Sequence, residues 1–126
     1  MDQVRAAYES ACVSGLVRAI KTRAEWIPEP ARSADAVVLL VLDGLGWSEV
    51  ESRVLRTLGS LDGGPITTVV PSTTPTALTS ISTGLAPAEH GVIGYRIFMG
   101  TGVLNVLRWK LHGSGAKMDG KSRRSR

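Results

Sequence analysis

The sequence has little cysteine and no long hydrophobic run. Cys12 is the only cysteine, so no disulfide can form within the chain and a cluster of thiolate metal ligands is excluded. The longest apolar run, Ala36 to Leu42, is far shorter than the roughly 18 residues of a membrane-spanning helix. The first residues mix charges with small apolar side chains, which is not the pattern of a secretory signal. These absences predict a cytoplasmic protein without a membrane span.

The excess of basic over acidic residues lies at one end of the chain. The formal net charge is +4 at pH 7, and the balance of basic over acidic residues in positions 112–126 accounts for all of it. Because the rest of the chain is neutral, we expect no specific nucleic-acid binding. Residues 112–126 contain almost nothing apolar, so they are predicted to form a disordered basic tail.

The remaining residues, 1–111, have the length of one domain. An amphipathic helix is predicted over 2–24, and Pro28 and Pro30 should prevent helix after it. The continuous apolar run 36–42 is typical of a parallel strand buried on both faces. Further helices are predicted over 48–58 and after Thr74, with strands over 66–70, 92–98 and 103–109. This order indicates an α/β fold with a mainly parallel sheet, in which right-handed crossovers place the ends of the strands 36–42 and 66–70 at one edge.

Asp43 follows the first predicted strand directly. A carboxylate in this place is well positioned to hold a cation, because the strand fixes the backbone while the side chain faces the crevice at the sheet edge. The alternative is structural, since Asp43 and Gly44 also form a common turn pair. The residue alone does not decide between a metal ligand and a turn.

Thr74 lies where a turn after the second strand meets the next helix. With Pro75 behind it, Thr74 is a plausible helix cap that needs no function. The same place suits a nucleophile, because the free N–H groups at a helix start attract a phosphoryl group. A threonine hydroxyl needs activation, and coordination to a metal that Asp43 helps to hold would lower its pKa. The pair therefore suggests metal-assisted phosphoryl or sulfuryl transfer.

Two other site types are weaker. Gly44 and Gly46 begin like a dinucleotide-binding fingerprint, but Glu49 occupies the third glycine position and would repel a pyrophosphate. His90 is a possible metal ligand, although a single histidine in a glycine-rich loop is more often structural.

Two segments together resemble a known family. They are Val38-Leu-Leu-Val-Leu-Asp-Gly-Leu-Gly and Pro71-Ser-Thr-Thr-Pro-Thr-Ala-Leu-Thr-Ser-Ile-Ser-Thr-Gly-Leu-Ala-Pro-Ala-Glu-His-Gly. The chain from about residue 36 to 109 is similar to the amino-terminal part of the alkaline phosphatase superfamily, in particular its type I phosphodiesterase / nucleotide pyrophosphatase branch. The resemblance implies that Asp43 ligates one of two divalent metals, usually zinc. It also implies that Thr74, ten residues before Gly84, is the nucleophile and a metal ligand, in preference to Thr73 or Thr76.

The sequence departs from this family in two respects. The phosphodiesterase branch has an asparagine that holds a phosphate oxygen where this chain has Tyr95, so that role is not carried over. The family's other metal ligands, which include an Asp-His-Gly element, lie far downstream, and this chain has no counterpart of them. The resemblance thus implies a truncated, partial three-layer sandwich of the alkaline-phosphatase type.

We therefore expect residues 1–111 to be the amino-terminal portion of a two-metal phosphohydrolase that acts on a small phosphate ester and is inactive as this chain. The metal ligands would be Asp43 and Thr74, with Thr74 as the nucleophile. Two alternatives remain. One is a noncatalytic remnant or interaction module with an exposed sheet edge, and the other is an α/β nucleotide-binding module. Neither the substrate nor the oligomeric state follows from the sequence.

Overall fold

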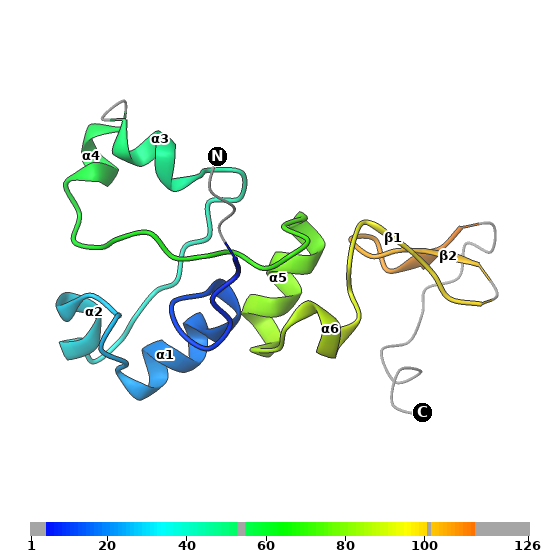
Figure 1. Ribbon diagram of the computed structural model, residues 1–126, viewed down its shortest axis with the longest axis horizontal. Helices are drawn as coiled ribbons and strands as arrows, with labels where there is room; N and C mark the ends of the chain where they lie inside the picture. The colour runs from blue at the N-terminus through cyan, green and yellow to red at the C-terminus, as the bar shows by residue number, and fades with distance from the viewer. Residues whose placement is uncertain (1–4, 53–54, 101, 113–126) are drawn as a thin grey trace.

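The computed structural model describes residues 5–52, 55–100 and 102–112. The molecule is elongated, with four short helices at one end, helix α5 in the middle and a small β-ribbon at the other end (Figure 1). The described elements in chain order are η1 (Val13–Gly15), α1 (Leu16–Thr22), α2 (Glu29–Ser33), α3 (Trp47–Glu51), α4 (Arg56–Gly59), α5 (Thr74–Thr83), α6 (Pro87–His90), β1 (Arg96–Phe98), β2 (Val103–Asn105) and β3 (Lys110–Leu111).

Helix α5 confirms the helix predicted after Thr74. It begins at Thr74 and ends at Thr83, followed by Gly84 in the left-handed conformation with φ 73°. The face that carries Thr76 and Ser80, four residues apart, is fully buried and packs against η1 and α1. Two short polar side chains on this face let neighbouring backbone approach closely, and α5 is therefore the central element of the molecule.

The helix predicted over residues 2–24 is much shorter in the structure. It is limited to η1 and α1, and residues 2–4 lie outside the described part of the chain. The preceding backbone pairs with a distant segment instead: Ala7 N–H donates to Thr67 Oγ1, Thr67 N–H to Ala11 O, and Val13 N–H to Thr67 O. A backbone group that makes these bonds cannot also make the bonds of a helix, so the tertiary pairing overrides the helical pattern.

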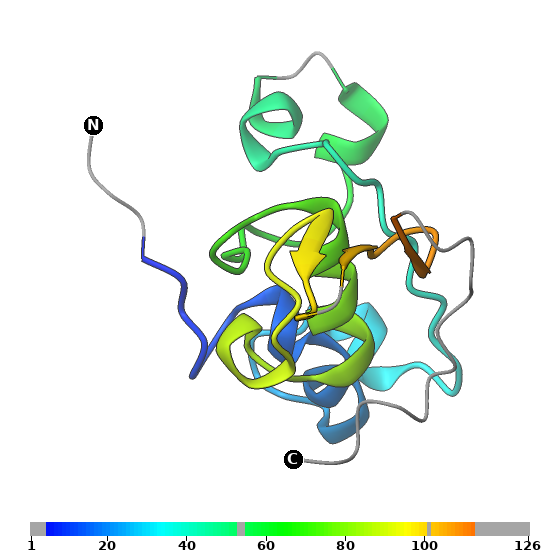
Figure 2. The ribbon, with the colours of Figure 1, turned by 90° about the vertical axis from the view of Figure 1, so that its right-hand side faces the viewer.

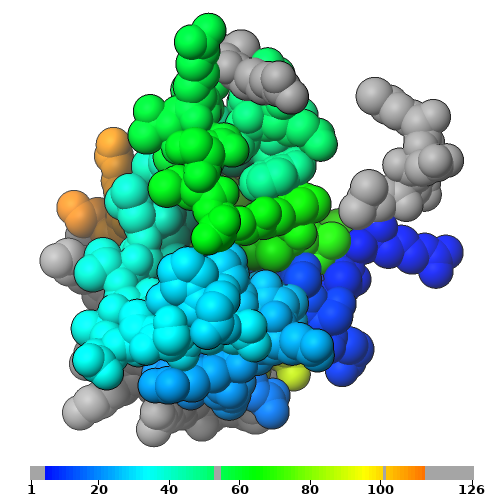
Figure 3. Space-filling model, turned by 90° about the vertical axis from the view of Figure 1, so that its left-hand side faces the viewer, coloured from blue at the N-terminus to red at the C-terminus, as the bar shows by residue number. Residues whose placement is uncertain are grey.

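The prediction of a buried parallel strand over 36–42 is wrong. The segment belongs to no strand in the described residues, and its side chains alternate in exposure. Val38 and Leu40 are 94% and 75% exposed, whereas Leu39 is 40% exposed. A strand is buried on both faces only where other layers cover both. Here the segment lies at the surface of the molecule, where Figure 3 shows cyan atoms uncovered, and all of its large side chains are at least 40% exposed.

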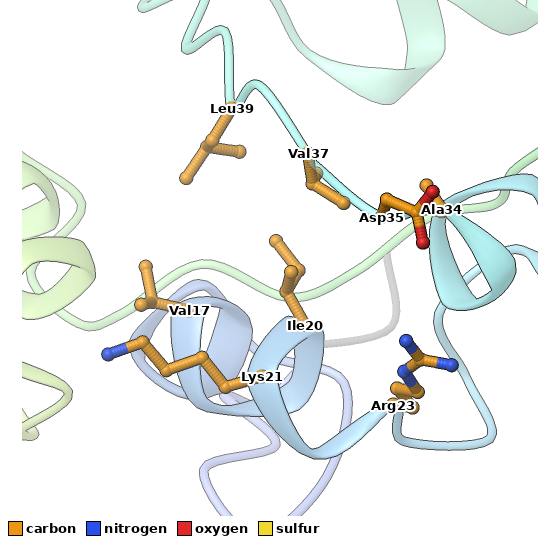
Figure 4. A pocket seen from close by; sticks show the side chains of 9 residues that line it. Val17, Ile20, Lys21, Arg23, Ala34, Asp35, Val37 and Leu39 are labelled. Atoms are coloured by element: carbon orange, nitrogen blue, oxygen red, sulfur yellow. The ribbon is translucent and has the colours of Figure 1, made fainter.

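The less exposed face of this segment, with Val37 and Leu39, lies opposite helix α1. An open cavity of about 390 Å³ separates them. Val37 and Leu39 point into it from one side and Val17 and Ile20 from the other (Figure 4). The apolar side chains therefore face one another without close packing.

The sheet of the described residues is antiparallel, so the prediction of a mainly parallel sheet is also wrong. Its strand order is β1-β2-β3, with Ile97 opposite Leu104 and Leu104 opposite Leu111. The segment 66–70 contributes only one parallel bridge, between Thr67 and Cys12. Because the short connections 99–102 and 106–109 join strands that are adjacent in sequence, these strands pair as a meander. The α/β class itself is confirmed.

The strands predicted over 92–98 and 103–109 are found as the shorter β1 and β2. A core of Val92, Leu104 and Val106 holds this ribbon together. Viewed from the ribbon's end, the ribbon stands in front of α5 and α6 (Figure 2). The ribbon thus has a small core of its own beside the central helix.

Two other helical predictions are changed in detail. The helix predicted over 48–58 is found as α3 and α4, and residues 53 and 54 between them lie outside the described residues. The short helix α2 forms despite its prolines, because Pro30 occupies the first turn, where its missing N–H group is not needed.

No helix in the described ranges has both the length and the hydropathy that crossing a bilayer requires. The predicted cytoplasmic location stays a prediction, and residues 113–126 of the predicted tail lie outside the described residues.

Candidate active site

Asp43 occupies a turn, and its carboxylate also makes a long-range contact. Leu45 N–H donates to Leu42 O at 3.3 Å across this turn, and Gly44 has φ 81°, a conformation that glycine adopts without strain. The side chain of Asp43 leaves the turn toward α5, where Oδ2 accepts a hydrogen bond from Thr74 Oγ1 at 2.8 Å. The turn and the contact with Thr74 therefore occur together, and the turn conformation does not argue against a role for the carboxylate.

Thr74 is the first residue of α5, and its hydroxyl has two polar partners. It donates to Asp43 Oδ2 and accepts a hydrogen bond from the Tyr95 phenol, also at 2.8 Å. Thr73, not Thr74, is the N-cap residue, and no side-chain capping bond is made. The structural alternative for Thr74, a hydroxyl that caps the helix amides, is therefore not what its side chain does here.

The neighbouring threonines face elsewhere. The hydroxyls of Thr73 and Thr76 lie 2.8 Å apart and bond to each other, and Thr76 is fully buried. Thr74 is only partly buried. In the threonine cluster that begins α5, Thr74 thus combines solvent access with a carboxylate neighbour.

An open groove runs beside Asp43. Its volume is about 600 Å³, and it passes between the segments around residues 41–50 and 64–68 and the side of α5. Thr68 and Ser72 add hydroxyl groups to it, while Trp47 and Ile81 add apolar surface. A cleft with a few polar groups in a mostly apolar lining is the usual form of a small-molecule site.

His90 has a structural environment. Its Nε2 lies 2.8 Å from the hydroxyl of the buried Ser80, and Val92 N–H donates to its Nδ1 at 3.0 Å. Both ring nitrogens therefore have partners that join α6 to α5 and to the start of the ribbon. This arrangement agrees with the structural alternative for His90.

The Asp43–Thr74 pair fits a divalent cation in part. Both side chains offer oxygen atoms, which bind hard and borderline cations, and the two atoms are already adjacent. Structural and catalytic zinc sites use at least three protein ligands. Within the described residues there is no group of three or more histidine, cysteine, aspartate or glutamate side chains that could hold a metal. The pair can therefore supply two ligands but not a complete site.

The sequence predicted the two partners Asp43 and Thr74 but not the third residue of this cluster. In the sequence Tyr95 stands out only as a departure from a family pattern, and its contact with Thr74 across 21 positions has no signal in the spacing of residues. The position of the phenol depends on how the ribbon approaches α5, which sequence patterns do not reveal.

The comparisons with known proteins agree with the resemblance drawn from the motifs. A search of curated proteins and a search of solved structures each found no match. The sequence model of the family described as "Type I phosphodiesterase / nucleotide pyrophosphatase" matches residues 37–113, which is more than half of the 126 residues and includes Asp43, Thr74 and Tyr95. Proteins of this family are hydrolases that generally depend on divalent metals. The chain therefore belongs to the type I phosphodiesterase / nucleotide pyrophosphatase family.

Proposed function

We propose that this chain carries the nucleophile and the first metal ligands of a phosphodiesterase of the nucleotide pyrophosphatase type. Thr74 is the nucleophile, and Asp43 with Thr74 contributes to holding a divalent metal. The observation that carries the proposal is the 2.8 Å hydrogen bond from Thr74 Oγ1 to Asp43 Oδ2 at the start of α5. Membership of the family supports the reaction class. We also propose that the described elements are part of an alkaline-phosphatase-like fold.

The proposed reaction begins with attack by the threonine oxygen. Thr74 Oγ forms a bond to phosphorus, the ester bond to the leaving alcohol breaks, and the hydroxyl proton has Asp43 Oδ2 as its nearest acceptor. Water then hydrolyses the threonyl phosphate and restores the hydroxyl. The nucleophile of such a two-step substitution must be accessible and activated. Thr74 is accessible, because it is only partly buried at the start of α5.

The activation of Thr74 is proposed to come from two divalent metals, which we expect to be zinc. A metal bound by Asp43 and Thr74 would lower the pKa of the threonine hydroxyl and polarise the phosphoryl oxygens. The described residues supply only part of the ligand set, so the site as described is incomplete and we propose that it has little or no turnover. The substrate is proposed to be a small phosphate ester that occupies the groove beside Asp43.

The test is covalent capture of the phosphoryl group on Thr74. The chain is incubated with zinc and bis(4-nitrophenyl) phosphate, with release of nitrophenolate and the mass of the peptide that contains Thr74 as readouts. One nitrophenolate per chain and an adduct on Thr74 are expected even where turnover is negligible, because the first step needs no water. Thr74→Val should lower the rate by about a thousandfold or more, since the nucleophile itself is removed.

Thr73→Val is the matched control, because the Thr73 hydroxyl bonds to Thr76 rather than to Asp43. It should react as the unmutated chain does. A Thr74→Val chain that releases nitrophenolate at the unmutated rate, or an unmutated chain that never acquires the adduct, would contradict the proposal.

One alternative retains some support. The exposed run with Val38 and Leu40 favours an interaction module that pairs with another chain. If the chain is such a module, Thr74→Val should not weaken binding of the partner. If the chain is a phosphodiesterase, substitutions of Val38 or Leu40 should not change formation of the adduct on Thr74. The nucleotide-binding alternative is disfavoured, because a carboxylate oxygen of Glu49 lies 2.7 Å from the place of a Cβ on Gly46, where a pyrophosphate would need to approach.

A further inference from the structure

The Thr74 hydroxyl receives a hydrogen bond that the proposed reaction does not yet use. Tyr95 donates its phenol proton to Thr74 Oγ1 across 2.8 Å, and the tyrosine side chain remains 49% exposed. Tyr95 lies immediately before β1, and its backbone carbonyl accepts a hydrogen bond from Val106 N–H at 2.9 Å. The buried core of the ribbon includes Val106. The ribbon therefore fixes the backbone from which the phenol reaches the start of α5.

The hydrogen bonds to Asp43 and Tyr95 determine which electron pairs of the Thr74 oxygen can attack phosphorus. A threonine hydroxyl has one proton and two acceptor lone pairs. In Thr74 the proton is directed to Asp43 and one lone pair accepts from Tyr95. Within the described residues this oxygen makes no further hydrogen bond. When its proton passes to Asp43, two lone pairs are free, one for the metal proposed above and one for a bond to phosphorus. Because the two bonds fix the rotation of the hydroxyl, they also fix the direction of that lone pair.

We propose that Tyr95 is a positioning residue for Thr74. Its phenol holds the threonine oxygen in the orientation from which a lone pair attacks phosphorus. This orientation raises the rate of attack, because a misdirected nucleophile must first rotate. Tyr95 acts through Thr74 and contacts no substrate in this proposal. The inference rests on the proposed nucleophilic role of Thr74, and it adds a residue that the motifs did not assign.

The chain provides its own control. Tyr8 is the other of its two tyrosines, and its phenol oxygen accepts a hydrogen bond from Val70 N–H at 3.0 Å. Tyr8 is 38% exposed, close to the value for Tyr95. Tyr8→Phe therefore removes a comparable hydroxyl and one hydrogen bond that involves neither Asp43 nor Thr74.

The first readout is the rate of adduct formation with bis(4-nitrophenyl) phosphate in the presence of zinc. Tyr95→Phe should lower the maximal rate by about tenfold, the usual effect of one lost hydrogen bond. The substrate concentration at half-maximal rate should not change, because binding of the ester does not involve Tyr95. Tyr8→Phe should change neither quantity. A Tyr95→Phe chain that reacts like Tyr8→Phe overturns the inference.

The second readout does not depend on activity. With ¹³C at the phenol carbon of tyrosine, the chain gives two signals, and Tyr8→Phe removes one and so assigns the other to Tyr95. Thr74→Val should move the Tyr95 signal because its acceptor is lost, whereas Thr73→Val should leave it in place. A Tyr95 signal that Thr74→Val does not move shows that the contact is absent and overturns the inference.

The two proposals fail in different ways. If the unmutated chain forms no adduct on Thr74, the proposed function fails and the role of Tyr95 in attack fails with it. If the adduct forms and depends on Thr74, but Tyr95→Phe keeps the full rate, only the inference about Tyr95 fails. If the adduct forms, depends on Thr74, and Tyr95→Phe lowers the rate while the Tyr95 signal follows Thr74→Val, both proposals are supported.

Discussion

The oxygen atoms of Asp43 and Thr74 lie 2.8 Å apart although the residues are 31 positions apart in sequence. A carboxylate that accepts a hydrogen bond from a hydroxyl in this way can also bind a cation together with it, because the two oxygen atoms are adjacent. The hydroxyls of Thr73 and Thr76, also near the start of α5, bond to each other instead of to Asp43. The three threonines at the start of α5 are of the same residue type, and it is their different neighbours that give them different chemical roles.

The residue-scale prediction concerns metal binding. Asp43→Asn keeps the size and the hydrogen-bond acceptor of the side chain but removes its charge. Zinc affinity should fall by at least about tenfold, because mutation of a residue that only orients a metal ligand already lowers metal affinity by that factor. Competition with a chromogenic chelator measures it. Asp35→Asn is the control, because Asp35 lines the separate cavity beside α1. Equal zinc affinity for the two variants would argue against Asp43 as a ligand.

Helix α5 connects these residues to the rest of the molecule. Its buried face contacts η1 and α1, its first residue contacts Asp43 and Tyr95, and Gly84 ends it with a hydrogen bond to Ser80 O. A helix that stopped later or frayed would change how the chain continues to α6 and to the ribbon. The end of α5 therefore matters for the position of Tyr95 as well as for stability.

The element-scale prediction is made for that end. Gly84→Ala should lower the free energy of unfolding by about 1 kcal/mol, because a side chain disfavours the left-handed conformation. The cost is conformational, since a Cβ at this position would lie 3.8 Å from Ser14 O, an ordinary contact. Urea denaturation followed by circular dichroism measures it. Gly64→Ala, where a Cβ meets nothing within 4 Å, should change stability much less; an equal loss in both variants would rule out this explanation.

At the scale of the whole molecule, a hydrophobic surface stands out. The run 36–42 carries no charge and exposes alternate side chains, with Val38 and Leu40 most open to solvent. Apolar, β-branched segments without charge and with unpaired backbone are prone to pair with other chains. The molecule thus combines a central helix that has one buried face with a segment, 36–42, whose large side chains are all exposed.

This surface leads to the whole-molecule prediction. Leu40→Lys should reduce concentration-dependent self-association, seen by light scattering, and leave the thermal midpoint nearly unchanged, because Leu40 is 75% exposed. Leu39→Lys is the matched comparison, because Leu39 points into the cavity beside α1 (Figure 4). It should lower the thermal midpoint more, because it replaces an apolar side chain that faces Val17 and Ile20 with a charged one. If Leu40→Lys destabilises the chain as much as Leu39→Lys does, the described exposure of this run is wrong.

The sequence by itself determined the local signals. Thr74 and Pro75 mark the start of α5 and Gly84 marks its end, because the conformations of proline and glycine depend only on nearby atoms. The side-chain cap that Thr74 could have supplied is not made. The motifs around Asp43 and Thr74 also identified the family. The expectation that these two residues meet was right in outcome, although the parallel strands from which it was argued are not formed in the described residues.

Only the tertiary structure decided the rest. The apolar run 36–42 has a strand's composition, but burial and pairing require partners that a local pattern cannot supply. Of the predicted helix over 2–24, the described residues before Val13 are not helical, because Thr67 bonds to the backbone near Ala11, a contact between distant segments. Tyr95 reaches Thr74 because the ribbon folds beside α5. Long-range contacts of this kind depend on the arrangement of the whole chain, whereas helix ends and turns depend on a few neighbouring residues.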